Sequence, residues 1–194
     1  MRPYLTLMLF LLTGISGPIS AQVTYTLAND HSFTIRGGSN LHQWSEIAGK
    51  VEGVSNITWN KQGTWDLNSL NLQVDVRSIK SSEGSIMDGK TYKALKADQN
   101  PNIIFKLTSP LHSIQPAAGG SLVKATGNLT IAGVTRSIDI QATVTANKTG
   151  RLTFVGSHQV KLTDYGIKPP TALFGVIKVY DDVTIDFKTS FYGE

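Results

Sequence analysis

The sequence predicts an all-β protein: an extended antiparallel barrel of about eight strands with one short helix. Apolar and polar residues alternate with period two through most of the chain after residue 21, as in strands with one dry and one solvated face. Turn signals such as Asn29-Asp30 and Ala132-Gly133 divide the alternating runs. Alternation alone also suits a sandwich. Glycines among the inward positions, such as Gly53, favour the strand bending that barrel corners require.

The first 21 residues have the three-part layout of a secretory signal peptide. Arg2 precedes an uncharged apolar run, and Gly17 and Pro18 lead to the small residue Ala21. This run is too short to span a bilayer, which takes about 20 residues. We therefore expect cleavage after Ala21 and a periplasmic or secreted protein of one domain, residues 22–194. No later stretch approaches membrane-spanning length, so no stable membrane insertion is expected.

Composition narrows the possible chemistry. The chain has no cysteine, which excludes disulfides, thiolate metal sites and cysteine nucleophiles. The formal net charge is +4, but the lysines are scattered among acids without a basic block, so no nucleic-acid partner is expected. No cofactor or metal is predicted either, because the four histidines lack metal-ligand spacing.

The expected strands follow one another along the chain with short connections. Their alternating runs are 23–27, 33–35, 47–53, 70–76, 103–107, 129–131, 138–144, 152–162 and 183–191. In the run 47–53, Ile47, Val51 and the intervening glycine are expected to share one face. One stretch, 84–98, breaks the alternation and predicts a short helix capped by Asp88 and ended by Asn100-Pro101. Such a helix would lie against one end of the barrel.

His158 is the one histidine expected inside the barrel. It shares strand parity with Phe154 and Val160, and a buried imidazole needs a hydrogen-bond partner. A neighbouring protein group could be that partner, or a polar group of a bound ligand. A small hydrolase or isomerase would need His158 for proton transfer, but no nucleophile is visible near it. No Gly-x-Ser-x-Gly or P-loop motif occurs, so an enzyme is not expected.

Four segments, 29–35, 98–105, 127–135 and 162–167, carry a family likeness. The third reads Gly-Asn-Leu-Thr-Ile-Ala-Gly-Val-Thr and the fourth contains Asp-Tyr-Gly-Ile. In this order and spacing they resemble the YceI-like family of exported bacterial lipid-binding proteins, over essentially the whole mature chain. The resemblance implies a lipocalin-like barrel whose lumen holds a long polyisoprenoid, without established catalysis and often in a homodimer. Residues 41–44 and 168–175 look like those of a Bacteroidetes-like branch, whereas 87–95 and Lys161 depart from the commoner pattern.

The leading hypothesis is an exported carrier of a polyprenyl, quinone or similar amphiphilic lipid. Carotenoid-like or fatty-acid ligands fit the same arguments. The alternative is a non-enzymatic stress-response or interaction module whose barrel is filled by its own side chains. For the carrier, the residues predicted to line the tunnel are Phe33, Trp44, Leu72, Val74, Phe105, Phe154, His158 and Phe187. Met87, Tyr92 and Leu95 are predicted to form its lid, with Tyr165 and Phe174 near the mouth.

Overall fold

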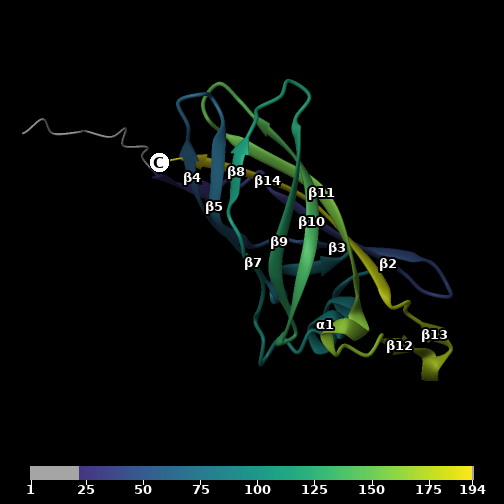
Figure 1. Ribbon diagram of the computed structural model, residues 1–194. Helices are drawn as coiled ribbons and strands as arrows, with labels where there is room; N and C mark the ends of the chain where they lie inside the picture. Colours follow the sequence, from purple (N-terminus) through teal and green to yellow (C-terminus); the bar gives the residue numbers. More distant parts are fainter. Residues whose placement is uncertain (1–21, 194) are drawn as a thin grey trace, which may run out of the picture.

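The structure is a computed structural model that describes residues 22–193, and eight antiparallel strands form a closed ring in it (Figure 1). In ring order they are β1 (Gln22–Leu27), β4 (Val51–Trp59), β5 (Trp65–Asp75), β7 (Asn102–Leu107), β9 (Ser121–Ile131), β10 (Val134–Ala146), β11 (Leu152–Lys161) and β14 (Asp182–Gly193). β1 closes the ring by pairing with both β4 and β14. The predicted eight-stranded lipocalin-like barrel is confirmed. The proposed signal peptide lies outside the described residues.

β14 pairs with different strands along its length, which lengthens the barrel. Its last residues pair with β1, while Thr184 to Lys188 pair with β2 (Ser32–Gly38). β2 is followed across the sheet by β3 (Gln43–Ala48) and β6 (Ile79–Ser81). The single α-helix of the described chain, α1 (Ser85–Ala94), packs beside β6. This end of the barrel is called the helix end below.

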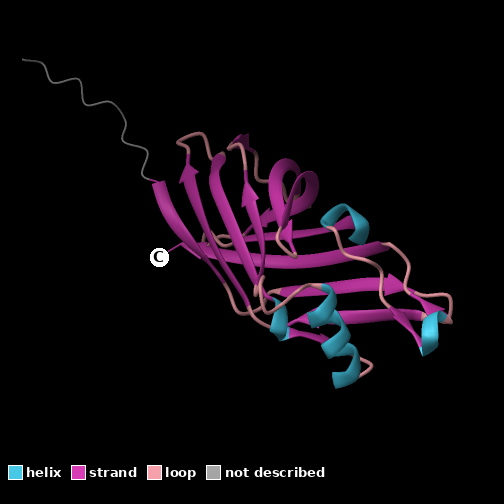
Figure 2. Cartoon of the chain, turned by 90° about the horizontal axis from the view of Figure 1, so that it is seen from below, coloured by secondary structure: helices cyan, strands magenta, loops and turns pink. Residues whose placement is uncertain are grey.

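Short elements complete the chain. β8 (Leu111–Ile114) pairs with β5, and β12 (Thr171–Ala172) pairs with β13 (Ile177–Lys178) in a small separate hairpin. The 3-10 turns are η1 (Val76–Ser78), η2 (Leu162–Tyr165) and η3 (Leu173–Gly175). Figures 1 and 2 show α1 and the β12–β13 hairpin at the same end of the molecule.

Local sequence explains the tight connections. β9 and β10 are joined by Ala132-Gly133, which both have positive φ angles of 49° and 83°. Two such residues form the type I′ turn whose twist matches an antiparallel pair, and glycine adopts this conformation without steric cost. The turn therefore sets the register of the longest hairpin in the barrel wall.

Aromatic packing fills the barrel opposite the helix end. Trp65 and Phe191 are almost completely buried, and the ring of Phe154 meets each of them edge-on, with centroids 6.2 and 6.0 Å apart. Edge-to-face contacts at this spacing are favourable. These three rings form an apolar floor of the lumen at the end opposite to α1.

Two local predictions need correction. Ile47 is 58% exposed whereas Val51 is buried, because β3 ends at Ala48 and the two-residue connection to β4 reverses the facing of the chain. The helix ends at Ala94 rather than at residue 98, and Gly84 occupies its N-cap position. Asp88 instead accepts hydrogen bonds from the Ser81 amide (2.8 Å) and Lys80 Nζ (3.1 Å), which fasten α1 to β6.

Candidate functional site: two cavities in line

The barrel lumen contains two apolar cavities of about 110 and 120 Å³. The helix-end cavity is bounded by α1, β3 and the loop before β14, and the mid-barrel cavity lies between it and the aromatic floor. Ile185 lines both cavities. The two cavities therefore meet at this aliphatic side chain of β14.

Strand alternation places the cavities one behind the other. Four further strands give one residue to the helix-end cavity and the residue two positions away to the mid-barrel cavity. These pairs are Ile35 and Phe33 on β2, Ile103 and Phe105 on β7, Ile131 and Leu129 on β9, and Val160 and His158 on β11. Residues two apart on a strand point to the same face about 6.6 Å apart. The two cavities are thus consecutive stretches of one lumen.

Glycines keep large rings against the barrel wall. A Cβ on Gly37 would lie 2.1 Å from the Trp44 indole, which is paired directly across from it. A Cβ on Gly156 would lie 2.5 Å from the Phe187 ring, again a direct cross-strand partner. Each ring therefore occupies the space that a side chain on the neighbouring strand would fill. This arrangement leaves the lumen open although its lining includes aromatic residues.

α1 covers the helix-end cavity with one stripe of side chains. The stripe consists of Met87, Lys90, Thr91, Ala94 and Leu95. Their spacing of three and four residues puts them on one helical face. Tyr92 attaches α1 to β6. Its hydroxyl donates a hydrogen bond to the Ile79 carbonyl (2.9 Å) and accepts one from Lys80 Nζ (2.7 Å).

The helix-end cavity carries polar groups among its apolar lining. Glu46 is only 5% exposed, and Thr91 Oγ1 donates a hydrogen bond to its carboxyl at 2.5 Å. Burial raises the pKa of Glu46, and the charge of Asp88 adds to this effect. Trp44 Nε1 is buried and has no hydrogen-bond partner in the described part of the chain. A ligand oxygen at this end could accept a hydrogen bond from that indole.

The mid-barrel cavity is less polar. Its polar side chains are His158 and Thr189, from β11 and β14. Burial lowers the pKa of His158, which favours the neutral imidazole. His158 pairs in register with Ile185, and Thr189 pairs with Phe154. The imidazole and the hydroxyl are therefore four residues apart along the strands, or about 13 Å, too far for a hydrogen bond between them.

Nine of the predicted site residues line the two cavities. Phe33, Leu72, Phe105, Phe154, His158 and Phe187 lie around the mid-barrel cavity. Trp44, Met87 and Leu95 lie around the helix-end cavity.

The other four predicted residues, Val74, Tyr92, Tyr165 and Phe174, line neither cavity. Val74 packs against the main apolar cluster, and the hydroxyl of Tyr92 is held by the backbone of β6. Tyr165 is buried in η2 within a second apolar cluster, where burial also raises its pKa. Phe174 is fully exposed.

Several lining residues were not among those predicted from the sequence. Glu46 was the most informative of them, because it lies two residues after Trp44 and therefore shares its inward parity. Val183 and Ile185 belong to the same alternating run as Phe187 and could have been assigned with it. Pro170 and Val179 come from a loop, where strand parity gives no guidance.

In residues 22–193, no group of three or more histidine, aspartate or glutamate side chains could hold a metal ion. Within the same range, no helix has the length and apolar character needed to cross a membrane.

Comparisons with known proteins agree with this architecture. A polyisoprenoid binding domain from Saccharophagus degradans, implicated in plant cell wall breakdown, superposes with a TM-score of 0.68 at 17% identity, over 89% of this chain and 99% of that one. Burkholderia cenocepacia BcnA gives 0.60 at 18% identity, over 82% and 95% of the two chains. The Campylobacter jejuni YCEI protein gives 0.53 at 17% identity, over 100% and 99%.

At these identities the likeness concerns the fold. No curated protein sequence matches the chain. The family model for the YceI-like domain matches residues 25–191, nearly the whole described chain. The chain therefore belongs to the YceI-like family.

Proposed function

We propose that this protein is an exported carrier that holds a long isoprenoid-like lipid, of polyprenyl or quinone type, in the barrel lumen. The observation that carries the proposal is the pair of apolar cavities in line, which offers a narrow and extended space rather than a round one. The similar domain from Saccharophagus degradans is described as binding a polyisoprenoid. A periplasmic or secreted location is part of the proposal and rests on the signal-like residues 1–21.

The two ends of the lumen suggest how the lipid is oriented. The floor of Trp65, Phe154 and Phe191 is apolar and closed, whereas the helix end contains Glu46 and the unpartnered indole N–H of Trp44. An apolar tail would lie toward the floor and a polar head toward α1. Burial of the tail contributes about 0.8 kcal/mol per methylene-sized group, so tail length would determine most of the affinity.

Binding accounts for the site better than catalysis does. The two polar side chains of the mid-barrel cavity, His158 and Thr189, are too far apart to act as a base and nucleophile pair. The cavities themselves favour a carrier over a module whose barrel is filled with side chains.

A chain-length series tests the proposal. Delipidated protein would be titrated with geraniol, farnesol, geranylgeraniol and solanesol in competition with a fluorescent polyene fatty acid. We expect the affinity to rise with chain length until the chain occupies both cavities, and then to level off. Equal affinity for the shortest and longest alcohols, or no displacement at all, would contradict the proposal.

A further inference from the structure

Two hairpins are joined into one rim at the helix end. The rim consists of residues 38–43, between β2 and β3, and residues 168–180, which include β12 and β13. Asn40 links them, because its Nδ2 donates to the Val176 carbonyl (2.9 Å) and its Oδ1 accepts from the Lys178 amide (2.8 Å). The Tyr180 amide also donates to the Gly38 carbonyl at 2.8 Å. The rim is therefore a connected structural unit.

Apolar side chains are concentrated at this end. Ten large apolar side chains in the described chain are strongly exposed, and five of them belong to the rim or to α1 beside it. They are Leu41, Ile86, Phe174, Val176 and Tyr180. An exposed apolar group of this kind is typical of a surface that contacts a partner or a membrane.

Phe174 has an unusual backbone as well as an unusual exposure. Its φ and ψ angles of 56° and 29° lie in the left-handed region, which bulky residues seldom adopt. This conformation occurs at the apex of the β12–β13 hairpin, where the ring is directed into solvent. Strained residues of this kind cluster at functional sites.

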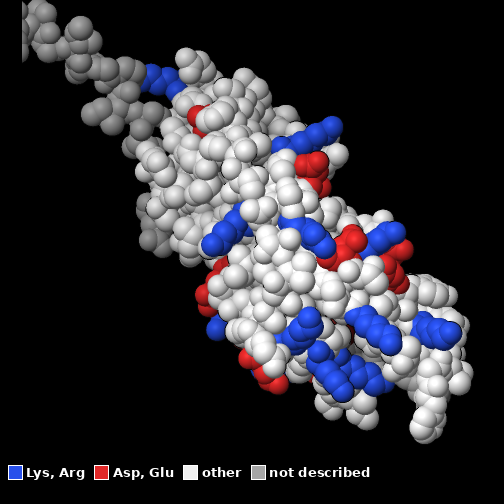
Figure 3. Space-filling view, turned by 60° about the horizontal axis from the view of Figure 1, so that its bottom comes forward, with Lys and Arg blue, Asp and Glu red and all other residues white. Residues whose placement is uncertain are grey.

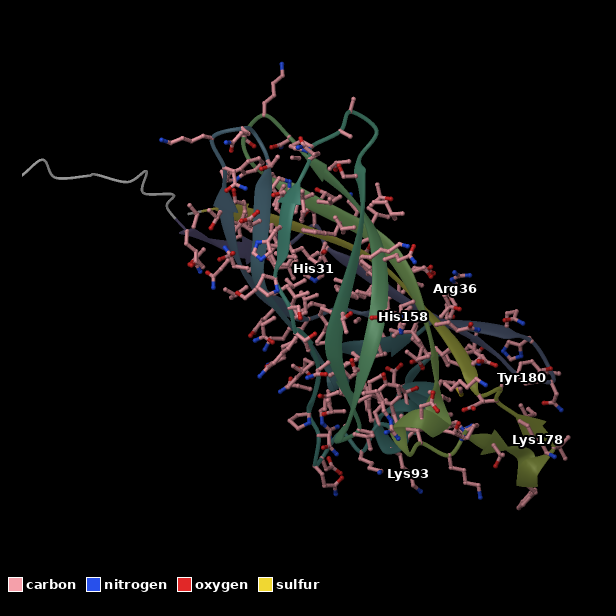
Figure 4. The ribbon with its side chains drawn as sticks, in the orientation of Figure 1. His31, Arg36, Lys93, His158, Lys178 and Tyr180 are labelled. Atoms are coloured by element: carbon pink, nitrogen blue, oxygen red, sulfur yellow. The ribbon has the colours of Figure 1, made fainter. Side chains whose placement is uncertain are left out.

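The charge around the rim is positive. Residues 165–180 contain Lys168 and Lys178 and no acidic residue. α1 and the turn that follows it add Lys90, Lys93 and Lys96, and none of these five lysines forms an ion pair within residues 22–193. Figure 4 shows Lys93, Lys178 and Tyr180 at this end, and Figure 3 shows basic side chains gathered on the lower part of the molecule.

Three acids beside α1 contact basic side chains: Asp88 contacts Lys80, Glu83 contacts His42, and Asp98 contacts Arg77. Three more acids flank residues 165–180 and form no ion pair within residues 22–193, namely Asp164, Asp181 and Asp182. The five lysines outnumber these three carboxylates, and the excess of positive charge suits an anionic partner.

The helix-end cavity reaches the surface at the rim. Its lining includes Pro170 and Val179 from the rim, and Met87 and Lys90 from α1. All four residues are half-buried, so the cavity meets solvent between the two elements. Exposed apolar residues and free lysines therefore surround the opening through which a ligand would pass.

We propose that the rim docks on the surface of an anionic lipid bilayer, with Phe174 inserted among the lipids and the cavity opening facing the membrane. Apolar side chains beside lysines are the combination that binds such interfaces, because burial and attraction to anionic head groups add together. The docking rests on the rim and α1 and does not depend on the proposed carrier function. Its role, the exchange of a lipid ligand between membrane and lumen, rests on the proposed carrier function.

Vesicle co-sedimentation tests the docking. Delipidated residues 22–194 would be mixed with phosphatidylcholine vesicles, with or without phosphatidylglycerol. We expect binding to the anionic vesicles that weakens as salt is added. Lys168→Gln and Lys178→Gln should each lower the partition coefficient about fivefold. Phe174→Ala should lower it by at least tenfold, and Leu122→Ala, an exposed apolar side chain outside the rim, should leave it unchanged.

Several results would overturn the docking. They are no binding to anionic vesicles, an equal loss for Phe174→Ala and Leu122→Ala, or rim-dependent crosslinking of the native protein to another protein without vesicle binding. The alcohol titration on the wild-type protein separates the two proposals. Normal alcohol binding by a wild-type protein that does not bind anionic vesicles refutes the docking alone, whereas vesicle binding by a wild-type protein that takes up no isoprenoid refutes the carrier function alone. Phe174→Ala should lose vesicle binding and keep normal alcohol binding, because Phe174 lines neither cavity.

Discussion

Replacing Ala142 by phenylalanine would place an aromatic ring in the mid-barrel cavity. Ala142 is 8% exposed, lines this cavity, and pairs with Val123 and Gly156 on the two neighbouring strands. The cavity volume is about 120 Å³. In a hollow lumen the added ring gains burial without displacing its neighbours.

Ala142→Phe should stabilise the folded protein. Full burial of a phenylalanine side chain is worth about 1.5–3 kcal/mol, and we expect about 1–2 kcal/mol of added stability because the site already holds a methyl group. For a domain of this size that corresponds to a rise in Tm of about 2–8 °C. In a lumen filled by its own side chains, the same change would overpack the core and cost about 1–3 kcal/mol.

The same substitution should weaken lipid binding. A ring that displaces only two methylene-sized groups of the lipid removes about 1.6 kcal/mol of burial, which weakens binding more than tenfold. Differential scanning calorimetry of delipidated protein and the alcohol titration measure the two effects. Val155→Phe is the control, because Val155 lies on the outer face of β11 and is half-exposed. A fall in Tm with unchanged lipid affinity for Ala142→Phe would refute the idea of a hollow lumen.

Three further changes test individual contacts. Burial raises the pKa of Glu46 above its ordinary 4.5, so its carboxyl disfavours the folded state increasingly as pH rises past that value. Glu46→Gln should therefore raise Tm at neutral pH and have little effect on Tm below pH 4.5. Glu52→Gln should leave Tm unchanged at both pH values, because Glu52 is exposed. Burial lowers the pKa of His158 below its ordinary 6.5, so the stability that the neutral imidazole allows should be fully present above pH 6.5 and fall as the pH drops below that value. His158→Phe should flatten this part of the plot of Tm against pH. An unchanged slope would exclude His158 as the source of the pH dependence. Gly37→Ala should push the Trp44 indole into the helix-end cavity and weaken lipid binding, and wild-type affinity would show that the ring has other space.

Much of the barrel could be predicted from period-two alternation, because burying one face of a strand constrains every second residue. The same rule located nine of the residues that line the cavities, including Phe105, Phe187 and His158. It failed at Ile47, where a two-residue connection reverses the facing of the chain. Alternation reports which face is dry, and it carries no information about how far a strand continues.

Whether the lumen is hollow was beyond the sequence for a different reason. The open space depends on cross-strand neighbours such as Gly156 and Phe187, which are about 30 positions apart and become partners only through the register of β11 and β14. Loop residues were equally inaccessible. Phe174 was predicted near the mouth; it lies between β12 and β13, and its ring is exposed to solvent rather than part of the cavity lining.

The lipid that the protein contains when it is made in its native cells tests the carrier function most directly. The mature protein would be purified from the native envelope without detergent, extracted with organic solvent, and the extract analysed by mass spectrometry against the Ala142→Phe variant. We predict about one isoprenoid-type lipid per chain in the wild-type protein and a marked loss in the variant. A wild-type protein that carries no lipid, or carries the same lipid in the same amount as the variant with the filled cavity, would contradict the carrier function.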